Sequence, residues 1–383
     1  MKIGILTQPL RNNYGGLLQN YALQKVLKDA GHTPITLDQG DSVSVLRHKI
    51  YYLKCYLLHL LSPNKYKRPI CLLSKEEESV IRKNTMYFID KYISHTKVLR
   101  SVHEISTKSK EAGIQAFVVG SDQCWRASYN YHFPAMFLNF VEKKSSIRKI
   151  AYAASFGIDT WELGENQNAF YRKWASDFDL ITVREKSGVD VCKKFLGVDA
   201  YNVLDPTLLL GKSDYVQLIQ QEKETESPGN LFYYILDPTE EKKIFISTVG
   251  EKLNLSPFMV LPKYKEEYRT RHNVENEIEG CVYPRVTQWL RAFMDAKMTI
   301  VDSFHGMVFS IIFNKPFWVI KNGGRGNTRF DSLLSTFGLE DRLIDDKDLF
   351  TIDIKKPIDW EKVNKKIDEK RKYSIDLLLK YLK

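Results

Sequence analysis

Short apolar runs alternate with amphipathic stretches along most of the chain. Runs such as KIGIL (2–6), IQAFVVG (114–120) and MTIVDS (298–303) end in small or polar residues, as buried parallel strands do. The stretches between them carry apolar residues at helical spacing. This alternation predicts an α/β fold built on parallel sheets.

The alternation is interrupted at QEKETESPGN (221–230), a polar stretch that contains both Pro and Gly. Such a stretch is typical of a domain boundary. We therefore expect a Rossmann-like domain over residues 1–222 and a second one over residues 229–345. Residues 346–383 carry apolar side chains at helical spacing from Trp360 onward, which predicts an amphipathic helix that packs back across the domains.

Composition narrows the class of protein. Of its residues, 43% are hydrophobic and 27% are charged, and this composition excludes a disordered or fibrous chain. Its length of 383 residues exceeds the usual size of a domain with one core. Its five cysteines are scattered without a C-x-x-C pair, and no apolar stretch is long enough to span a bilayer. With no visible secretory signal, these features lead us to expect a cytoplasmic protein.

Charge suggests the kind of partner. The net charge of +10 favours a nucleic acid, an anionic membrane or a phosphorylated substrate. No aromatic-flanked nucleic-acid motif is present, so nucleic acid is not an expected partner. Residues 42–75 contain no acidic side chain, and their cations alternate with YYLKCYLLHLL (51–61). This segment fits either a helix on an anionic membrane surface or a helix packed on its own domain.

The first candidate site follows the first apolar run. In open α/β sheets, ligands bind beyond the carboxyl ends of the strands, and NNYGGLLQ (12–19) occupies such a position. Two glycines and a helix N-terminus allow the backbone to approach an anion or a sugar closely. The stretch lacks the dinucleotide and Walker fingerprints, and a simple tight turn is the alternative. The acceptor-binding residues expected here are Asn13, Tyr14, Gly15, Gly16 and Gln19.

Two further strand ends carry charged residues. Asp122 follows the run FVVG and is suited to accept a proton from a hydroxyl, or merely to cap the next turn. Arg184 ends the run LITV and is suited to bind a phosphate or carboxylate, or to form a surface pair with Glu185.

The stretch DSFHG (302–306) places a histidine after a buried strand. Ser303 can cap the helix that follows, and His305 lies in its first turn, where it can contact an anion and transfer a proton. A structural histidine is the alternative. The loop KNGGRGNTR (321–329) supplies three cations that could clamp an anion, or could belong to a flexible surface loop. The full donor-binding set expected is Arg184, Ser303, Gly306, Lys321, Arg325 and Arg329.

Several of these stretches, taken in order, resemble the polysaccharide pyruvyl transferase family. They include the first 31 residues after Met1, FVVGSDQCW, AYAASFG, ITVREKSG, VLDPTLLL, DSFHGMVFSIIFNKPF and RGNTRFDSLLSTFGLEDR, so the resemblance covers nearly the whole chain. It implies a GT-B-like pair of Rossmann-type domains facing a cleft. It also implies transfer of pyruvate from phosphoenolpyruvate, a co-substrate, onto two hydroxyls of a glycan sugar as a ketal.

The resemblance also assigns residues. His305 matches the family's important histidine and Arg184 a donor-binding arginine. Ser303 stands where many members carry an arginine, and Gly15-Gly16 where many carry Gly-Asp. Our hypothesis is that Arg325 or Arg329 supplies the missing charge.

On this interpretation, we expect His305 to be the catalytic acid and Asp122 to be the catalytic base. We expect no metal and no cofactor, since the histidines are dispersed and H-E-x-x-H is missing. The expected acceptor is a lipid-linked glycan, with peripheral contact at the inner membrane face. Two alternatives remain open: a GT-B glycosyltransferase that uses a nucleotide-sugar donor, and a non-catalytic polyanion binder.

Overall fold

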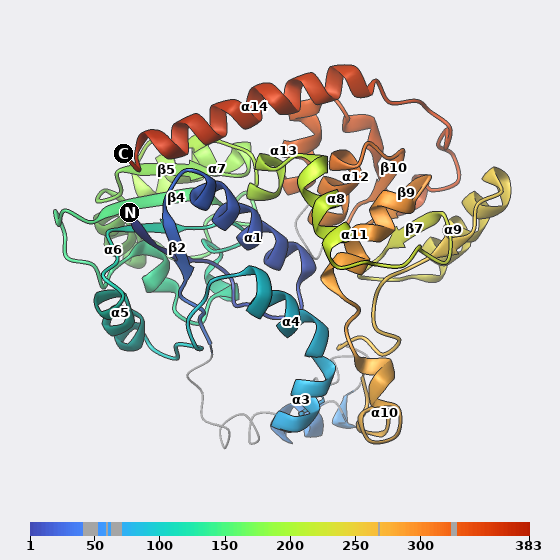
Figure 1. Cartoon of the computed structure of the whole chain (residues 1–383), viewed down its shortest axis with the longest axis horizontal. Coiled ribbons are helices and arrows are strands. Elements are labelled where there is room, and N and C mark those ends of the chain that lie inside the picture. Colours follow the sequence, from blue (N-terminus) through green and yellow to red (C-terminus); the bar gives the residue numbers. More distant parts are fainter. Residues whose placement is uncertain (41–52, 59, 63–70, 267–268, 323–327) are drawn as a thin grey trace.

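The structure is a computed structural model that describes residues 1–40, 53–58, 60–62, 71–266, 269–322 and 328–383. Two parallel sheets form its framework (Figure 1). The first has the strand order β2-β1-β3-β4-β5-β6 and the second the order β11-β10-β9-β7-β8. The α/β fold with two parallel sheets that the apolar runs predict is therefore confirmed.

Strands of the first sheet lie between residues 2 and 202. They are β1 (Lys2–Leu6), β2 (Thr33–Thr36), β3 (Ala116–Val119), β4 (Arg148–Ala154), β5 (Leu180–Val183) and β6 (Tyr201–Asn202). The helices that accompany them are α1 (Tyr14–Asp29), α5 (Val102–Glu111), α6 (Glu165–Ala175) and α7 (Lys186–Val191). Every residue of β3 and β5 is buried, because helices cover both faces of a parallel sheet.

The second sheet lies between residues 231 and 344. Its strands are β7 (Leu231–Tyr234), β8 (Pro257–Phe258), β9 (Met298–Val301), β10 (Phe317–Ile320) and β11 (Leu343–Ile344). Its helices are α9 (Glu240–Leu253), α11 (Val286–Asp295), α12 (Phe304–Ile312) and α13 (Thr328–Phe337). Helix α8 (Lys212–Gln221) packs against α11, although the expected range of residues 1–222 assigned it to the first domain.

Aromatic side chains join the two halves. The ring of Tyr14 on α1 lies 5.6 Å from that of Trp289 on α11, and Tyr215 on α8 lies 5.0 Å from Phe309 on α12. These residues belong to one hydrophobic cluster that includes parts of both sheets. The two sheets are thus held together by continuous apolar packing.

Helix α14 (Trp360–Lys380) returns from the second half to the first (Figure 1). Val363 and Ile367 are buried, and Ser374 Oγ accepts a hydrogen bond of 3.1 Å from the Leu204 N–H. Arg371 Nε donates to the Leu208 carbonyl at 2.8 Å. The expected C-terminal helix that packs back across the domains is therefore confirmed.

A small lobe contains segments from both halves of the chain. It consists of α3 (Lys75–Ile81) and α10 (Arg271–Asn276), with a buried cluster of Cys71, Ile81, Val274 and Cys281. Helix α4 (Lys83–Tyr92) connects α3 to the main body, where it packs against α1 and α11. Of the basic segment 42–75, residues 42–52, 59 and 63–70 lie outside the described residues. Among the helices that the structure describes, none combines the length and apolarity needed to cross a bilayer.

Candidate active site

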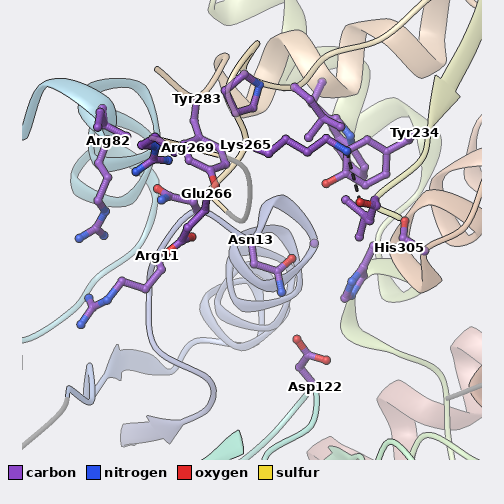
Figure 2. A pocket seen from close by; sticks show the side chains of 18 of the residues that line it. Arg11, Asn13, Arg82, Asp122, Tyr234, Lys265, Glu266, Arg269, Tyr283 and His305 are labelled. Carbon is purple, nitrogen blue, oxygen red and sulfur yellow. Dashed lines mark hydrogen bonds between the residues drawn. The ribbon is translucent and has the colours of Figure 1, made fainter. Parts of the chain in front are cut away.

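A pocket of about 830 Å³ opens where the carboxyl ends of the two sheets and the small lobe meet (Figure 2). Its described lining contains five Lys and Arg side chains against three carboxylates. The predicted site residues in this lining are Asn13, Gly15, Asp122, Ser303, His305 and Arg329. The structure therefore brings predicted residues from the first half of the chain into one pocket with predicted residues from the second half.

Helix α1 begins at the pocket wall. Asn13 caps it, with Oδ1 accepting a 3.2 Å hydrogen bond from the Gly16 N–H. A Cβ added to Gly15 would lie 2.1 Å from Cγ and Nδ1 of His305, far inside any real contact. The close neighbour that requires glycine here is therefore the imidazole from the other half of the chain.

Helix α12 carries that imidazole. Ser303 Oγ accepts a 3.1 Å hydrogen bond from the Gly306 N–H and so begins the helix directly after β9. A Cβ on Gly306 would lie 2.7 Å from Ser303 Oγ and 3.0 Å from Val301 Cβ, so Gly306 permits this tight start. Ser303 thus lines the pocket while it positions the first turn that holds His305.

Arg184 lies behind the pocket wall. Its guanidinium contacts Asp122 at 3.3 Å, Glu185 at 3.3 Å and Asp205 at 2.7 Å, and its side chain is 2% exposed. Burial tends to lower the pKa of Arg184, but the three carboxylates outweigh burial and raise it above its ordinary value.

The ring of Phe304 covers Arg184 at 4.2 Å. Arg184 is not among the described residues that line the pocket. The described contacts of the Arg184 guanidinium are ion pairs with neighbouring carboxylates, and its predicted role in donor binding stays a prediction.

Asp205 connects this network to His305. Its Oδ2 lies 3.7 Å from His305 Nε2, and its Oδ1 accepts hydrogen bonds from the N–H and hydroxyl of Thr207. Burial tends to raise the pKa of Asp205, but His305 and Arg184 overcome burial and hold it well below its usual range. The buried carboxylate is thus an anion that faces the imidazole.

Asp122 occupies the bend after β3. Its φ of 64° lies in the left-handed region, which Asp tolerates better than most residues. One carboxylate oxygen is 3.3 Å from Arg184 Nη2, and the residue also lines the pocket. Asp122 is therefore held by a buried cation with its carboxylate at the cavity.

Arg329 is a buried cation that, unlike Arg184, lines the pocket. Its guanidinium lies 5.8 Å from the centre of the Phe304 ring, on which Arg184 also packs. Burial, and next the nearby charge of Arg184, lower the pKa of Arg329 to about 10. An anion bound beside it would reduce this electrostatic cost.

Lys321 and Arg325 are the remaining cations of the predicted donor site. Lys321 Nζ pairs with Asp345 Oδ2 at 2.7 Å and is not among the described lining residues. Arg325 lies outside the described residues, so the hypothesis that Arg325 or Arg329 replaces the family arginine is represented here by Arg329 alone.

Three predicted acceptor residues have structural contacts. The Tyr14 hydroxyl donates to the Pro284 carbonyl at 2.9 Å. Gln19 Nε2 donates to Thr7 Oγ1 and the Gly16 carbonyl, while its Oε1 accepts from the Ser121 N–H at 3.1 Å. The described pocket lining includes neither of these two residues nor Gly16.

Sequence reasoning missed the lobe side of the pocket. Arg11, Arg82, Arg269 and Glu266 lie on this side in Figure 2, and Glu78 also lines the pocket. Lys265 extends toward Tyr234, and its Nζ donates to the Ile235 carbonyl at 2.8 Å. Arg82 binds Glu78 Oε1 at 2.9 Å and the Leu10 carbonyl at 3.0 Å, whereas Arg269 is 5% exposed. The basic and aromatic run KYKEEYR (263–269) was the available signal for this wall.

The sequence is similar to that of a known protein family. The model of a family described as polysaccharide pyruvyl transferase matches residues 13–324. No curated protein matches the sequence.

Two solved structures share the two-domain architecture at low sequence identity. The UDP-GlcNAc 2-epimerase from Neisseria meningitidis bound to UDP-GlcNAc is 10% identical, with a TM-score of 0.51, over 100% of this chain and 99% of that chain. The S. aureus MnaA–UDP structure is 11% identical, with a TM-score of 0.50, over 100% and 96%. These similarities confirm the predicted GT-B-like fold.

Proposed function

The chain belongs to the polysaccharide pyruvyl transferase family, and we propose that it moves pyruvate from phosphoenolpyruvate onto two hydroxyls of a glycan sugar. The observation that carries this proposal is the grouping of three chemical functions at one end of the pocket. His305 supplies an imidazole, Asp122 a carboxylate and Arg329 a buried guanidinium.

Phosphoenolpyruvate would bind at this inner end. Its phosphate and carboxylate need cations, and Arg329 is a buried cation whose lowered pKa makes a neighbouring anion favourable. The N-terminus of α12 adds a partial positive charge beside His305. Ser303, which stands where many relatives carry an arginine, acts here as the cap of that helix.

His305 is the general acid in this mechanism. The π electrons of the donor's methylene carbon take the proton of the imidazolium, which forms a C–H bond and leaves a cation at the carbon that bears the carboxylate. Asp205, with its Oδ2 3.7 Å from His305 Nε2, places a buried negative charge beside the ring. Positioned acids of this kind contribute roughly 10²–10⁴ in rate.

Asp122 is the general base. It takes the proton of the attacking sugar hydroxyl as the first C–O bond forms. The bond from that carbon to the phosphate oxygen then breaks, phosphate leaves with the electron pair and takes up the proton from Asp122, and the cation re-forms. A second hydroxyl closes the ketal as its proton passes to the neutral imidazole of His305. One hydroxyl proton thus ends on the released phosphate, and the other replaces the proton that His305 gave to the new methyl group.

The glycan acceptor would occupy the remaining volume, toward the lobe. We propose that the acceptor carries a lipid-linked phosphate, because Arg11, Arg82 and Arg269 line this side of the pocket. The proposed location is the cytoplasmic side of the membrane, in keeping with five free cysteines in the described residues.

Incubation with phosphoenolpyruvate and a panel of galactosides tests the reaction. We expect phosphate release together with a mass gain of one pyruvate ketal on an acceptor. A His305→Gln variant is the matched control and should release phosphate roughly 10²–10⁴-fold more slowly. Consumption of a UDP-sugar with no use of phosphoenolpyruvate would instead support the nucleotide-sugar glycosyltransferase.

A further inference from the structure

Four leucines stand exposed on one short helix of the basic segment. Residues 53–58 and 60–61 are helical, and this blue helix lies at the lower edge of Figure 1, at the same end as α3 and α10. The exposed fractions are 57% for Leu53, 50% for Leu57, 58% for Leu60 and 81% for Leu61. Packing of this helix on its own domain, one of the two structures that the sequence allowed, does not bury these side chains.

The four leucines share one face of the helix. Their spacing of i, i+4, i+7 and i+8 places them in a single stripe, because a helix turns about 100° per residue. Other exposed apolar side chains, such as Ile244 on α9 and Phe350, lie on separate elements. Scattered apolar residues need no explanation, whereas a contiguous stripe marks an interaction surface.

The charge around the stripe indicates its partner. Lys54 is exposed on the same helix, and residues 42–75 contain seven Lys and Arg but no acidic residue. Two copies of this segment would repel one another, which disfavours self-association through the leucines. An anionic lipid surface accepts both features, since acyl chains receive a convex apolar stripe without a matching groove and headgroups attract the cations.

We propose that the leucine face of residues 53–61 docks the chain on an anionic lipid bilayer. The docking surface does not depend on the reaction proposed above, but it would serve that reaction. Cys71, Leu72 and Leu73, ten or more residues farther along the same segment, line the pocket. Docking would therefore bring the lobe side of the pocket close to a lipid-linked acceptor.

Vesicle sedimentation with the full chain tests this proposal. The probes are vesicles of phosphatidylcholine with phosphatidylglycerol, and vesicles of phosphatidylcholine alone. We expect the wild-type chain to pellet with the first and stay in the supernatant with the second, and added salt to weaken the binding. Replacement of the four leucines by Gln should lower the partition coefficient at least about tenfold, since each leucine gains from burial.

Ile244→Gln is the matched control, because Ile244 is similarly exposed at 56% on another helix, and it should pellet like the wild type. Wild-type protein that ignores anionic vesicles, or a four-leucine variant that pellets unchanged, would overturn the proposal. The proposal would also be overturned if the wild type bound no vesicles and the four-leucine variant instead lost self-association, as measured by sedimentation velocity. Phosphate release with a free galactoside should be unchanged in the variant, so a failure of docking and a failure of the reaction remain distinguishable.

Discussion

Gly15→Ala tests how the pocket is assembled from the two halves of the chain. The new Cβ would lie 2.1 Å from Cγ and Nδ1 of His305 and 2.5 Å from its Cβ, whereas ordinary contact begins at 3.4 Å. The ring must therefore retreat by more than 1 Å, or α1 and α12 must separate. Overpacking of this kind costs about 1–3 kcal/mol, of which the helix preference of alanine over glycine offsets about 0.5–1 kcal/mol. A displacement of about 1 Å at a catalytic group can cost roughly 10²-fold in rate.

The expected result is a separation of stability from activity. Urea denaturation should show a loss of unfolding free energy of about 2 kcal/mol or less, while kcat/KM for phosphate release falls roughly 10²-fold. Gly164→Ala is the matched control, because a Cβ there meets nothing within 4 Å. A Gly15→Ala enzyme with unchanged kcat/KM would refute the claim that the imidazole is held against α1 for catalysis.

Three further predictions concern the charged groups. His305→Gln should lower turnover roughly 10²–10⁴-fold with little change in melting temperature, and unchanged ketal formation would remove His305 from the chemistry. Arg184→Met leaves three buried carboxylates without their cation and should lower the free energy of unfolding, measured by urea denaturation, by about 3–5 kcal/mol. Acid should restore part of this stability by protonating the carboxylates. An unshifted urea midpoint would count against the network. Because Arg329 is a buried cation in the wall of the proposed donor site, Arg329→Gln should raise the KM for phosphoenolpyruvate roughly tenfold or more, since a hydrogen bond to a charged group contributes about 1.5–3 kcal/mol. An Arg329→Gln enzyme with an unchanged KM would contradict the role of Arg329.

The fold was largely accessible from the sequence because its signals are local. Apolar runs such as those of β3 and β9 are buried along their whole length, so their pattern predicts parallel strands directly. The packing of α8 against α11 was not accessible, since it depends on contacts between segments more than 60 residues apart. Polar composition marks where a chain leaves a sheet, but not which sheet the next helix covers.

The site was only partly accessible. Asp122, Ser303, His305 and Arg329 line the pocket, because each follows or adjoins a strand end where the sheet topology gathers side chains. Gly15 was singled out for a close approach, but sequence alone could not show that His305 is its neighbour. Likewise, the ion pairs of Arg184 with Asp122 and Asp205 join residues that are 62 and 21 positions apart in the chain.

The lobe side of the pocket illustrates the same limit. Arg82 and Arg269 lie almost 190 residues apart, and only the packing of α3 beside residues 278–281 brings their segments to one wall. No periodicity or spacing in the sequence encodes that meeting. Its only trace is a high local density of charged and aromatic residues.

A crystal structure with bound phosphoenolpyruvate tests the central claim most directly. We expect density at the inner end of the pocket, with the phosphate or carboxylate on Arg329 and the methylene carbon facing His305. Density for the compound only at the lobe side, or an inner end that stays empty at saturating concentration, would contradict it.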